Sequence, residues 1–375
     1  MRAIRVIIYM IWGVVAYSCC TPSALTKSGL DASRFEKIVD GESVALYTLT
    51  NSEGMEVCVT NLGARVVSIM AKDREDSWRE VTLGFNNIDD YIERRMAIGG
   101  TVGRVAGRIK GGHIVIDDKE YTLPINDGGN TLHGGVVQWH NRPFKVVKVT
   151  TESITMRYIS PDGESGFPGE VTLDVIYSLD SDGGLLIEYE ASTTAPTQLN
   201  LTNHTFFNLS GDPTVNNEEN IIVIEADSVC YVDPIAVVND GTRRAVAGTP
   251  MDLRVATRIG DVIDSDHEQT KLKGGFDHGW MLNRNSDGSL GRVILHSPKS
   301  GITMETTTSQ EVVHLSAASF LNGKVIGRGG NPLIYRGGVC VETQHQSVDI
   351  DGNVPESATL RPGRSYRGWC LYRFY

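Results

Sequence analysis

The chain has 375 residues, of which 40% are hydrophobic and 22% are charged, and its formal net charge is −11. This composition is typical of a globular protein, and the length is sufficient for a large hydrophobic core. The acidic excess comes without any block rich in lysine or arginine, which argues against a nucleic-acid-binding protein.

Residues 1–20 have the layout of a secretory signal peptide. A short basic start precedes the apolar run Ile7–Tyr17, which is too short for a comfortable transmembrane helix. The end of the signal, AYSC at residues 16–19, resembles a bacterial lipoprotein signal, in which the cysteine after the cleavage site receives the lipid.

Cys19 is therefore the expected lipidation site, with lipidation at Cys20 and plain secretion after a nearby cut as the alternatives. Residues 21–33 are expected to form a polar tether. These features predict an exported protein of the periplasm or outer membrane that touches the membrane only through its lipid anchor.

Short segments of alternating hydrophobicity follow, and turn residues such as Asp-Gly separate them. This density of strands predicts an all-β protein, a large antiparallel β-sandwich, and residues 34–375 are expected to form one domain. Met251–Ile259 is the candidate for a short helix. The predicted strands are Val44–Leu49, Glu56–Thr60, Val66–Met70, His113–Ile116, Val146–Val149, Ile154–Ile159, Val171–Leu179, Leu185–Ala191, Ile221–Glu225, Arg292–His296, Ile302–Thr306, Val312–Leu315, Val339–Gln344 and Leu371–Phe374.

Four cysteines follow the signal, and none has the spacing of a metal site. In an exported protein they could form disulfides, but three lie in apolar alternating runs, which also suits buried free thiols. They are Cys58, Cys230, Cys340 and Cys370.

The stretch Leu199–Gly211 carries the histidine of greatest interest. Read with a period of two, it has one mainly apolar face and one polar face with His204 at its centre. Histidine exchanges protons most readily near neutral pH, and the hydroxyl and amide groups around it suit a polyhydroxylated ligand. The sequence predicts that the polar face is the floor of a cleft, although a structural histidine on a sheet would give the same pattern.

Two glycine-rich segments could present polar side chains to that cleft. Arg108 lies between Gly107 and Ile109 and could project as a fixed hydrogen-bond fork, while a tight turn between strands is the simpler interpretation. His133 precedes two glycines, so a turn presents it, although such histidines are usually exposed and idle.

Two further segments carry carboxylates. Asp277 lies in FDHGW, where an aspartate beside aromatic rings suits a sugar, and a surface turn is the alternative. Glu342 lies in VCVETQ on the face of the strand opposite Val339 and Val341. A carboxylate in an apolar strand is costly unless it is paired or used, and the alternative is a solvated face.

A metal site is a competing hypothesis, since several histidines and Glu342 could supply ligands. The chain has no HxH or HExxH spacing, so no catalytic metal is predicted.

In this order, the segments resemble the aldose 1-epimerase (galactose mutarotase) family, and the resemblance covers nearly the whole chain from Phe35. The family's fold is a large antiparallel β-sandwich, the galactose mutarotase-like supersandwich, in agreement with the predicted strands. The segments are NLGARVVSI (61–69), VTLGF (81–85), DDY (89–91), GGTVGRVAGRI (99–109), NTLHGG (130–135), LTNHTFFNLSG (201–211), FDHGW (276–280), VETQ (341–344) and LRPG (360–363).

The resemblance implies a general acid at His204 and a general base at Glu342, with Arg108, His133 and Asp277 holding hydroxyls of a monosaccharide substrate. The base would take the proton of the anomeric hydroxyl while the acid protonates the ring oxygen, so that the ring opens, rotates about C1–C2 and closes again. This chemistry needs no metal and no nucleotide cofactor.

The chain departs from the family pattern at four places. Gly107 replaces a frequent asparagine, the segment after HGG is short and carries residues 138–141 instead of a longer insert, and Ser347-Val348 replaces a Pro-Asp pair. His314 stands where a hydroxyl-binding glutamine is usual. Because a protonated imidazole only donates hydrogen bonds, we expect His314 to bind substrate, to shift sugar preference and to lose affinity at acid pH.

Two other functions share these residues. A glycoside hydrolase would need two facing carboxylates, for which Glu342 and Asp277 are the candidates. A sugar-binding lipoprotein without catalysis would use His204 only as a hydrogen-bond donor. The sequence leaves the preferred sugar and the oligomeric state open.

Overall fold

The structure is a computed structural model that describes residues 25–235 and 237–375. The predictions of a signal peptide and of lipidation at Cys19 lie outside the described residues. Within the described ranges, no helix is long and apolar enough to cross a membrane.

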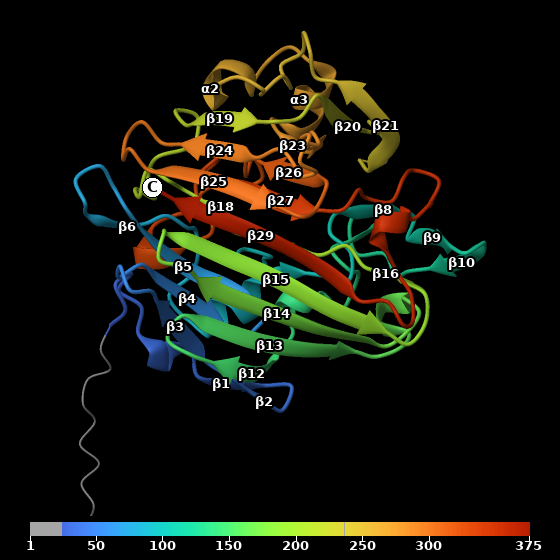
Figure 1. The fold of residues 1–375 in the computed structure, drawn as a ribbon, viewed down its shortest axis with the longest axis horizontal. Coiled ribbons are helices and arrows are strands. Elements are labelled where there is room, and N and C mark those ends of the chain that lie inside the picture. The colour runs from blue at the N-terminus through green and yellow to red at the C-terminus, as the bar shows by residue number, and fades with distance from the viewer. Residues whose placement is uncertain (1–24, 236) are drawn as a thin grey trace, which may run out of the picture.

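One layer of the fold is a long antiparallel sheet that runs diagonally across the front of Figure 1. Its strands alternate as the sequence predicts: in the central strand β14, every second side chain is buried. In spatial order the strands are β12 (Lys145–Val149), β13 (Ser153–Ser160), β14 (Val171–Leu179), β15 (Gly184–Thr193), β29 (Tyr366–Phe374), β25 (Thr303–Thr308), β24 (Val293–His296), β19 (Ile221–Ile224) and β22 (Thr257–Arg258).

The opposite layer consists of two shorter antiparallel sheets, one from the first quarter of the chain and one from the second half. The first contains β3 (Leu46–Thr50), β4 (Glu56–Thr60), β5 (Arg65–Lys72) and β6 (Trp78–Glu80). The second contains β18 (Phe206–Phe207), β27 (Val339–Gln344), β26 (Val312–Ser316), β23 (Asp277–Met281), β20 (Ser228–Val232) and β21 (Asn239–Ala245).

The two layers enclose one continuous hydrophobic core. Val175 of β14 belongs to it together with Ile69 of β5 and Leu315 of β26. The hydroxyl of Tyr372 also crosses the core and donates to the carbonyl of Val341 at 2.8 Å. The prediction of an all-β antiparallel sandwich is therefore confirmed.

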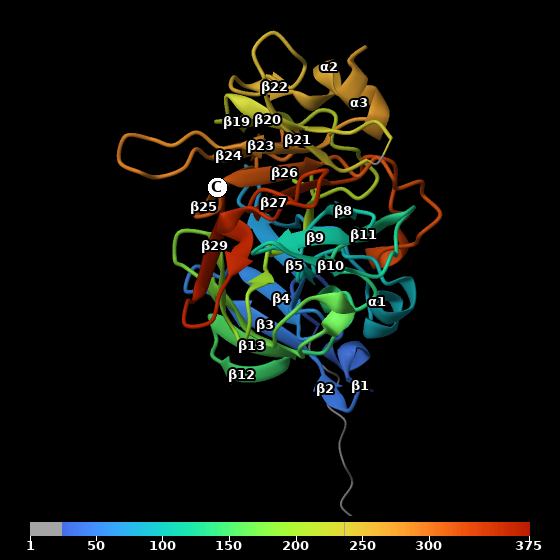
Figure 2. The same ribbon diagram turned by 90° about the vertical axis from the view of Figure 1, so that its right-hand side faces the viewer.

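Short strand pairs and helices complete the fold, and β8 to β11 lie beside the sheet of β26 and β27 in Figures 1 and 2. The strand pairs are β1 (Lys37–Val39) with β2 (Glu42–Val44), β7 (Thr101–Val102) with β17 (Thr202–Asn203), β8 (Arg108–Lys110) with β11 (Asn130–Leu132), β9 (His113–Ile116) with β10 (Lys119–Thr122), and β16 (Thr197–Gln198) with β28 (Thr359–Leu360). The helices are α1 (Ile88–Arg94), α2 (Ile259–Val262) and α3 (Glu268–Lys273), with 3₁₀ turns η1 (Ala32–Phe35), η2 (Trp139–Asn141), η3 (Glu164–Gly166), η4 (Arg328–Gly330) and η5 (Glu356–Ala358).

The prediction of a helix over Met251–Ile259 is wrong. Residues 257–258 of this segment pair with β19 as strand β22, and the short helix α2 begins only at Ile259. Met251 and Leu253 are both fully buried in the core. The apolar spacing in this segment therefore reflects an irregular loop packed on the core rather than one face of a helix.

The described cysteines Cys58, Cys230, Cys340 and Cys370 are buried free thiols. The sequence left disulfides and buried free thiols open for these four cysteines, and the structure confirms free thiols.

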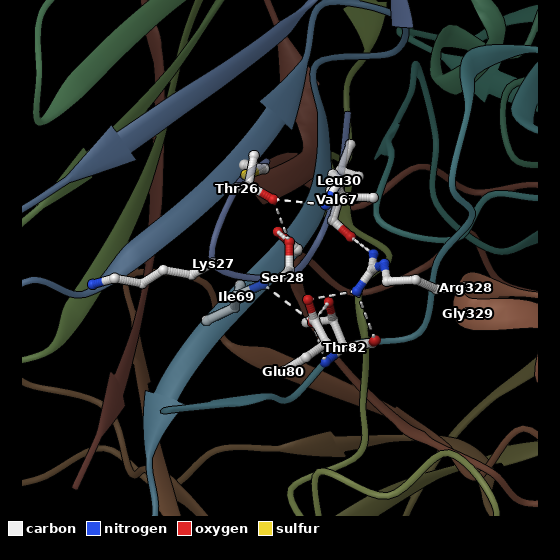
Figure 3. A network of polar contacts seen from close by, with 12 residues as sticks. Thr26, Lys27, Ser28, Leu30, Val67, Ile69, Glu80, Thr82, Arg328 and Gly329 are labelled. Atoms are coloured by element: carbon white, nitrogen blue, oxygen red, sulfur yellow. Dashed lines mark hydrogen bonds and ion pairs between the residues drawn. The ribbon is translucent and has the colours of Figure 1, made fainter. Parts of the chain in front are cut away.

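From Thr26 on, the chain is bonded to the fold (Figure 3). The backbone N–H of Lys27 donates to Glu56 at 2.7 Å, and the hydroxyl of Ser28 donates to Ser68 at 3.0 Å. Leu30 is 1% exposed. Of the predicted tether at residues 21–33, the first four residues lie outside the described part, and the residues from Thr26 on contact the fold.

The same region contains a half-buried arginine that connects the turn η4 to the neighbouring sheet (Figure 3). Arg328 forms an ion pair with Glu80 at 2.5 Å and donates to the carbonyl of Val67. Glu80 in turn accepts from the backbone N–H of Thr82 at 2.9 Å. These contacts join η4 to a backbone carbonyl of β5 and to a carboxylate of β6.

We expect the N-terminal turn η1 to contribute to global stability. Phe35 is fully buried, and its ring lies 6.5 Å from that of Tyr91, so Phe35→Ala should lower the free energy of unfolding by about 3–5 kcal/mol. Urea unfolding measures this change. Ile38→Ala is the control, because Ile38 is 67% exposed and its loss should change stability by less than about 0.5 kcal/mol. Equal effects of the two variants would contradict the prediction.

Candidate active site

A single cavity collects the side chains that the sequence singled out. It opens between the sheet of β26 and β27 and the short strands β8 and β11. The predicted site residues on its lining are Arg108, His133, His204, Asp277, His314 and Glu342.

Backbone hydrogen bonds to a glycine pair fix His204 in the turn between β17 and β18. Its N–H donates to the carbonyl of Gly100 at 2.9 Å, and its carbonyl accepts from the N–H of Gly99 at 2.8 Å. A side chain at Gly99 would collide with the carbonyl oxygen of Val66, and its φ of +73° also favours glycine. The glycine-rich segment thus positions the histidine backbone, and no phosphate site is needed to explain it.

The structure corrects one prediction about the stretch Leu199–Gly211. It is not one continuous strand, and its polar face is not a continuous floor of the cavity. The Asn200 amide bonds to the backbone of His345, and the Asn208 amide bonds to the carbonyls of Asp212 and Val215. A break between β17 and β18 turns His204 toward the cavity. The amides of Asn200 and Asn208 instead form hydrogen bonds with backbone groups of neighbouring loops.

Glu342 reaches the cavity from the middle of β27. Val339 and Val341 on the other face of the strand lie in the core, which fixes the register. The Glu342 side chain is only 4% exposed, and its Oε1 lies 3.5 Å from Nε2 of His204. A buried carboxylate and an imidazole thus face the same space, which is the geometry required for paired proton transfer.

Cys340 contacts the other nitrogen of the His204 ring. Its Sγ lies 3.4 Å from Nδ1. A thiol can donate to a bare Nδ1 or accept from a protonated one, so the contact can hold the ring in either protonation state. The Nε2 atom of His204 therefore stays directed at Glu342.

His204, Cys340 and Glu342 also have ligand atoms within 4.8 Å of one another, which makes them the candidate metal ligands among the described residues. A zinc ion would require Cys340 as a thiolate. Burial first, and then the charge of Glu342, raise the pKa of this thiol well above its usual value. The chemistry of the donors therefore fits acid–base work better than metal binding.

Arg108 and His133 line the opposite wall of the cavity. Arg108 projects from β8, as the sequence suggested, and its Nε donates to Asp127 at 2.6 Å. The His133 ring lies 5.3 Å from the His204 ring, and its Nδ1 accepts from the N–H of Gly107 at 3.2 Å. Burial, followed by the neighbouring His204, keeps the pKa of His133 well below its usual value, so its ring is neutral.

Asp277 is the first residue of β23 and is held by two cationic side chains. Lys273, at the end of α3, lies 2.9 Å from one carboxylate oxygen, and His314 lies 3.1 Å from the other. Burial opposes ionisation of Asp277, but His314 and Lys273 outweigh it, so the pKa of Asp277 lies well below its usual value. In place of the surface turn considered for FDHGW, a strand begins at Asp277. Phe276 and Trp280 are almost fully buried in the core, as the surface-turn alternative expected, and are not exposed to a sugar.

His314 lies on β26 with its neighbours Val313 and Leu315 in the core, as the alternation predicts. Burial tends to lower the pKa of His314, but Asp277 and then Glu342 raise it above its usual value. A loss of affinity through protonation of His314 was expected at acid pH. Because the pKa of His314 is raised, its imidazole loses its proton at a higher pH than an ordinary histidine does.

His278 is next to Asp277 in the sequence, but its imidazole pairs with a residue of α3. It is fully buried, and its Nε2 lies 3.1 Å from the side-chain oxygen of Gln269. Burial lowers the pKa of His278 to about 3. It is a structural residue of the β23 layer.

Sequence reasoning missed three residues that complete the site: Asp127, Lys273 and Cys340 as the partner of His204. Only Lys273 had a local signal, since it lies four residues before Asp277. The others meet their partners through the tertiary fold.

The cavity continues past His204 and Asp277 into a second space. Phe206 and Phe320 line it with their rings 5.8 Å apart, and Gln138 and His140 of the short segment 138–141 form another part of its wall. The segment 138–141 therefore lies at the cavity rather than on a distant surface.

The Aldose 1-epimerase family model matches residues 45–373 of the chain. Galactose mutarotase from Bos taurus is 32% identical over 323 residues, which are 86% of this chain and 92% of that protein. Aldose 1-epimerase from Escherichia coli K12 is 31% identical over 340 residues, which are 89% of this chain and 96% of that protein.

Two solved structures show the same architecture. An aldose epimerase homologue from C. elegans has a TM-score of 0.81 and 29% identity, covering 88% of this chain and 99% of that one. Galactose 1-epimerase from Lactobacillus acidophilus has a TM-score of 0.80 and 30% identity, covering 90% of this chain and 96% of that one.

We expect His278 to make stability depend on pH. With a pKa of about 3 in the folded state and about 6.5 in the unfolded state, it binds its proton only on unfolding, so stability falls as pH drops from about 6.5. His278→Gln should reduce this slope by up to about 1.4 kcal/mol per pH unit. Urea unfolding between pH 6.5 and 4.5 measures both slopes. Parallel curves for wild type and variant would contradict the prediction.

Proposed function

The chain belongs to the aldose 1-epimerase family, and on this premise we propose that it interconverts the α and β anomers of aldohexoses such as glucose and galactose. The one observation that carries the mechanism is the distance of 3.5 Å between His204 Nε2 and Glu342 Oε1 at the cavity wall.

In the forward step, Glu342 takes the proton of the C1 hydroxyl, and imidazolium His204 gives its Nε2 proton to the ring oxygen. The C1–O5 bond breaks, and the electron pair of the C1 hydroxyl forms the aldehyde. Rotation about C1–C2 presents the other carbonyl face. His204 then takes back the O5 proton while Glu342 returns its proton to the carbonyl oxygen, so the ring closes with no net proton change.

The remaining lining residues suit recognition of the sugar hydroxyls. Arg108 retains guanidinium donors beyond the one given to Asp127, and each carboxylate oxygen of Asp277 has a further lone pair. The imidazoles of His133 and His314 add contacts at the cavity wall. A ring of fixed donors and acceptors around the acid–base pair orients the anomeric centre.

A glycoside hydrolase is a weaker explanation of this site. It needs a second carboxyl group that can carry a proton or act as a nucleophile, and Asp277 is the candidate. Its carboxylate is instead neutralised by Lys273 and His314, with a pKa well below its usual value. Asp277 therefore serves as an acceptor for hydroxyls rather than as an acid.

Polarimetry on fresh α-D-glucose and α-D-galactose tests the function, and we expect Glu342→Gln to lose nearly all mutarotation. The amide keeps the shape of the side chain but cannot take the proton, and one positioned proton transfer contributes about 10²–10⁴-fold. Glu190→Gln, on the exposed outer face of β15, is the matched control and should retain the wild-type rate.

More than about a tenth of the wild-type rate in Glu342→Gln would contradict a general-base role. If the wild-type protein binds sugars but shows no mutarotation, a sugar-binding lipoprotein would be favoured instead. A panel of aldoses in the same assay identifies the preferred sugar.

We also propose that the protein is exported and anchored through a lipid on Cys19, on the basis of the AYSC signal ending at this residue. Cys19→Ala with Cys20 kept should block processing or release the protein from the membrane fraction. Mass spectrometry of the N-terminal peptide provides the direct measurement. An unlipidated peptide together with unchanged fractionation would refute the anchor.

A further inference from the structure

The second space beside the catalytic cavity has the size and the lining of a ligand site. Its volume is about 540 Å³, which lies within the range of about 300–1,000 Å³ typical of small-molecule sites. Beyond the wall that it shares with the catalytic cavity, its lining includes aromatic side chains and polar side chains from the segments 138–140 and 316–319. The acid–base chemistry uses none of these side chains, so they are available for another part of the substrate.

An exposed aromatic ring lies on this lining. Phe320 is 58% exposed, whereas its neighbour Phe206 is 1% exposed, and their rings meet edge to face with centroids 5.8 Å apart. The buried ring thus supports the exposed one. An aromatic ring that is held in this way can pack against the apolar face of a sugar ring.

Two polar side chains on the same lining have hydrogen-bonding atoms that the described part of the chain does not satisfy. The Oγ atom of Ser319 is buried and has no hydrogen-bond partner among the described residues. His140 is 1% exposed, and its ring nitrogens form no hydrogen bond of ordinary geometry there, although the Arg95 backbone affects the pKa of the ring. Since buried polar groups nearly always have partners, a hydroxyl-rich ligand in the second space would explain both.

The acid–base pair sets the orientation of the sugar relative to the second space. Glu342 lines only the catalytic cavity, whereas His204 lines both spaces. With the C1 hydroxyl at Glu342 and the ring oxygen at His204, the bond from C1 to O5 points toward the second space. C5 follows O5 in the ring and carries C6, while C2 lies on the other side of C1. A substituent on O6 therefore extends into the second space, and a substituent on O2 does not.

We propose that the second space is a subsite for a further sugar unit, and that the enzyme accepts the reducing-end aldohexose of 1→6-linked disaccharides. The unit attached at O6 stacks on Phe320, and its hydroxyls reach Ser319 and His140. Ring opening proceeds as before, because the anomeric carbon of the reducing unit stays free. This inference rests on the proposed function, which orients the sugar ring.

The first test measures binding and needs no catalysis. Isothermal titration calorimetry compares glucose with two disaccharides of glucose, each at anomeric equilibrium: isomaltose, which is α-(1→6)-linked, and kojibiose, which is α-(1→2)-linked. We expect isomaltose to bind about three- to tenfold more tightly than glucose, from one stacking contact and added hydrogen bonds, and kojibiose to show no such gain. Equal affinities for isomaltose and glucose, or for isomaltose and kojibiose, would overturn the inference.

The second test removes the contacts one at a time and measures kcat/KM by polarimetry. The ratio of the isomaltose value to the glucose value should fall about three- to tenfold in Phe320→Ala and about two- to tenfold in Ser319→Ala. Tyr375→Ala is the matched control, because Tyr375 is 61% exposed and is not among the residues that line the second space. It should leave the ratio at the wild-type value, and an unchanged ratio in both subsite variants would refute the subsite.

The tests separate this inference from the proposed function. Glucose mutarotation without any advantage for isomaltose would overturn the subsite and leave the epimerase assignment intact. Tighter binding of isomaltose without mutarotation of any sugar would overturn the proposed function and support the subsite. If circular dichroism shows that Phe320→Ala does not fold, the ratio in Ser319→Ala decides.

Discussion

The site depends on keeping one carboxylate buried, charged and beside an imidazole. Removing a carboxylate from water is costly unless nearby groups compensate, and the Glu342 side chain is only 4% exposed. The imidazole of His204 lies 3.5 Å from Glu342, and His314 is the residue directly opposite Glu342 on the neighbouring strand. The same partial exclusion of water strengthens these interactions, because charges act more strongly where the local dielectric is low.

The sandwich core makes this placement possible. A strand that buries one face cannot shift by one residue without exposing its apolar side chains, so the core fixes which residues of β27 face the cavity. The position of His204 depends instead on two glycines, Gly99 and Gly100, which form hydrogen bonds with its backbone carbonyl and N–H. Glu342 is thus held by strand register, and His204 by a turn that only small residues can form.

The fold was predictable where a local pattern carried it. The bounds of β9, β14 and β27 agree with the predicted strands, because alternation along one strand records which face meets the core. The helix α1 was missed, since Ile88–Arg94 is too short to show a helical period, and its capping residue Asn87 is a weak signal alone. The irregular loop at Met251 was mistaken for a helix because both place apolar residues at similar spacing.

The site was predictable in its members but not in their pairing. Glu342 and His314 could be placed on cavity faces from strand alternation, and the motifs pointed to His204 and Asp277, although His204 reaches the cavity from a turn and not from a strand. The sequence could not show that Asp127 pairs with Arg108, or that Cys340 contacts the His204 ring. These contacts join segments distant in the chain, and they decide which groups are charged.

The histidines of this site show why pairing matters more than residue type. His140 and His278 are buried and His133 is half-buried, and desolvation depresses the pKa of all three. His314 lines the same cavity, yet its pKa is raised, because carboxylates adjoin it on two strands. A carboxylate within hydrogen-bond reach thus separates a histidine that serves as a neutral hydrogen-bonding group from one that adds a positive charge. The pKa of His314 is therefore raised by its carboxylate neighbours, and the residue type alone would not have indicated this.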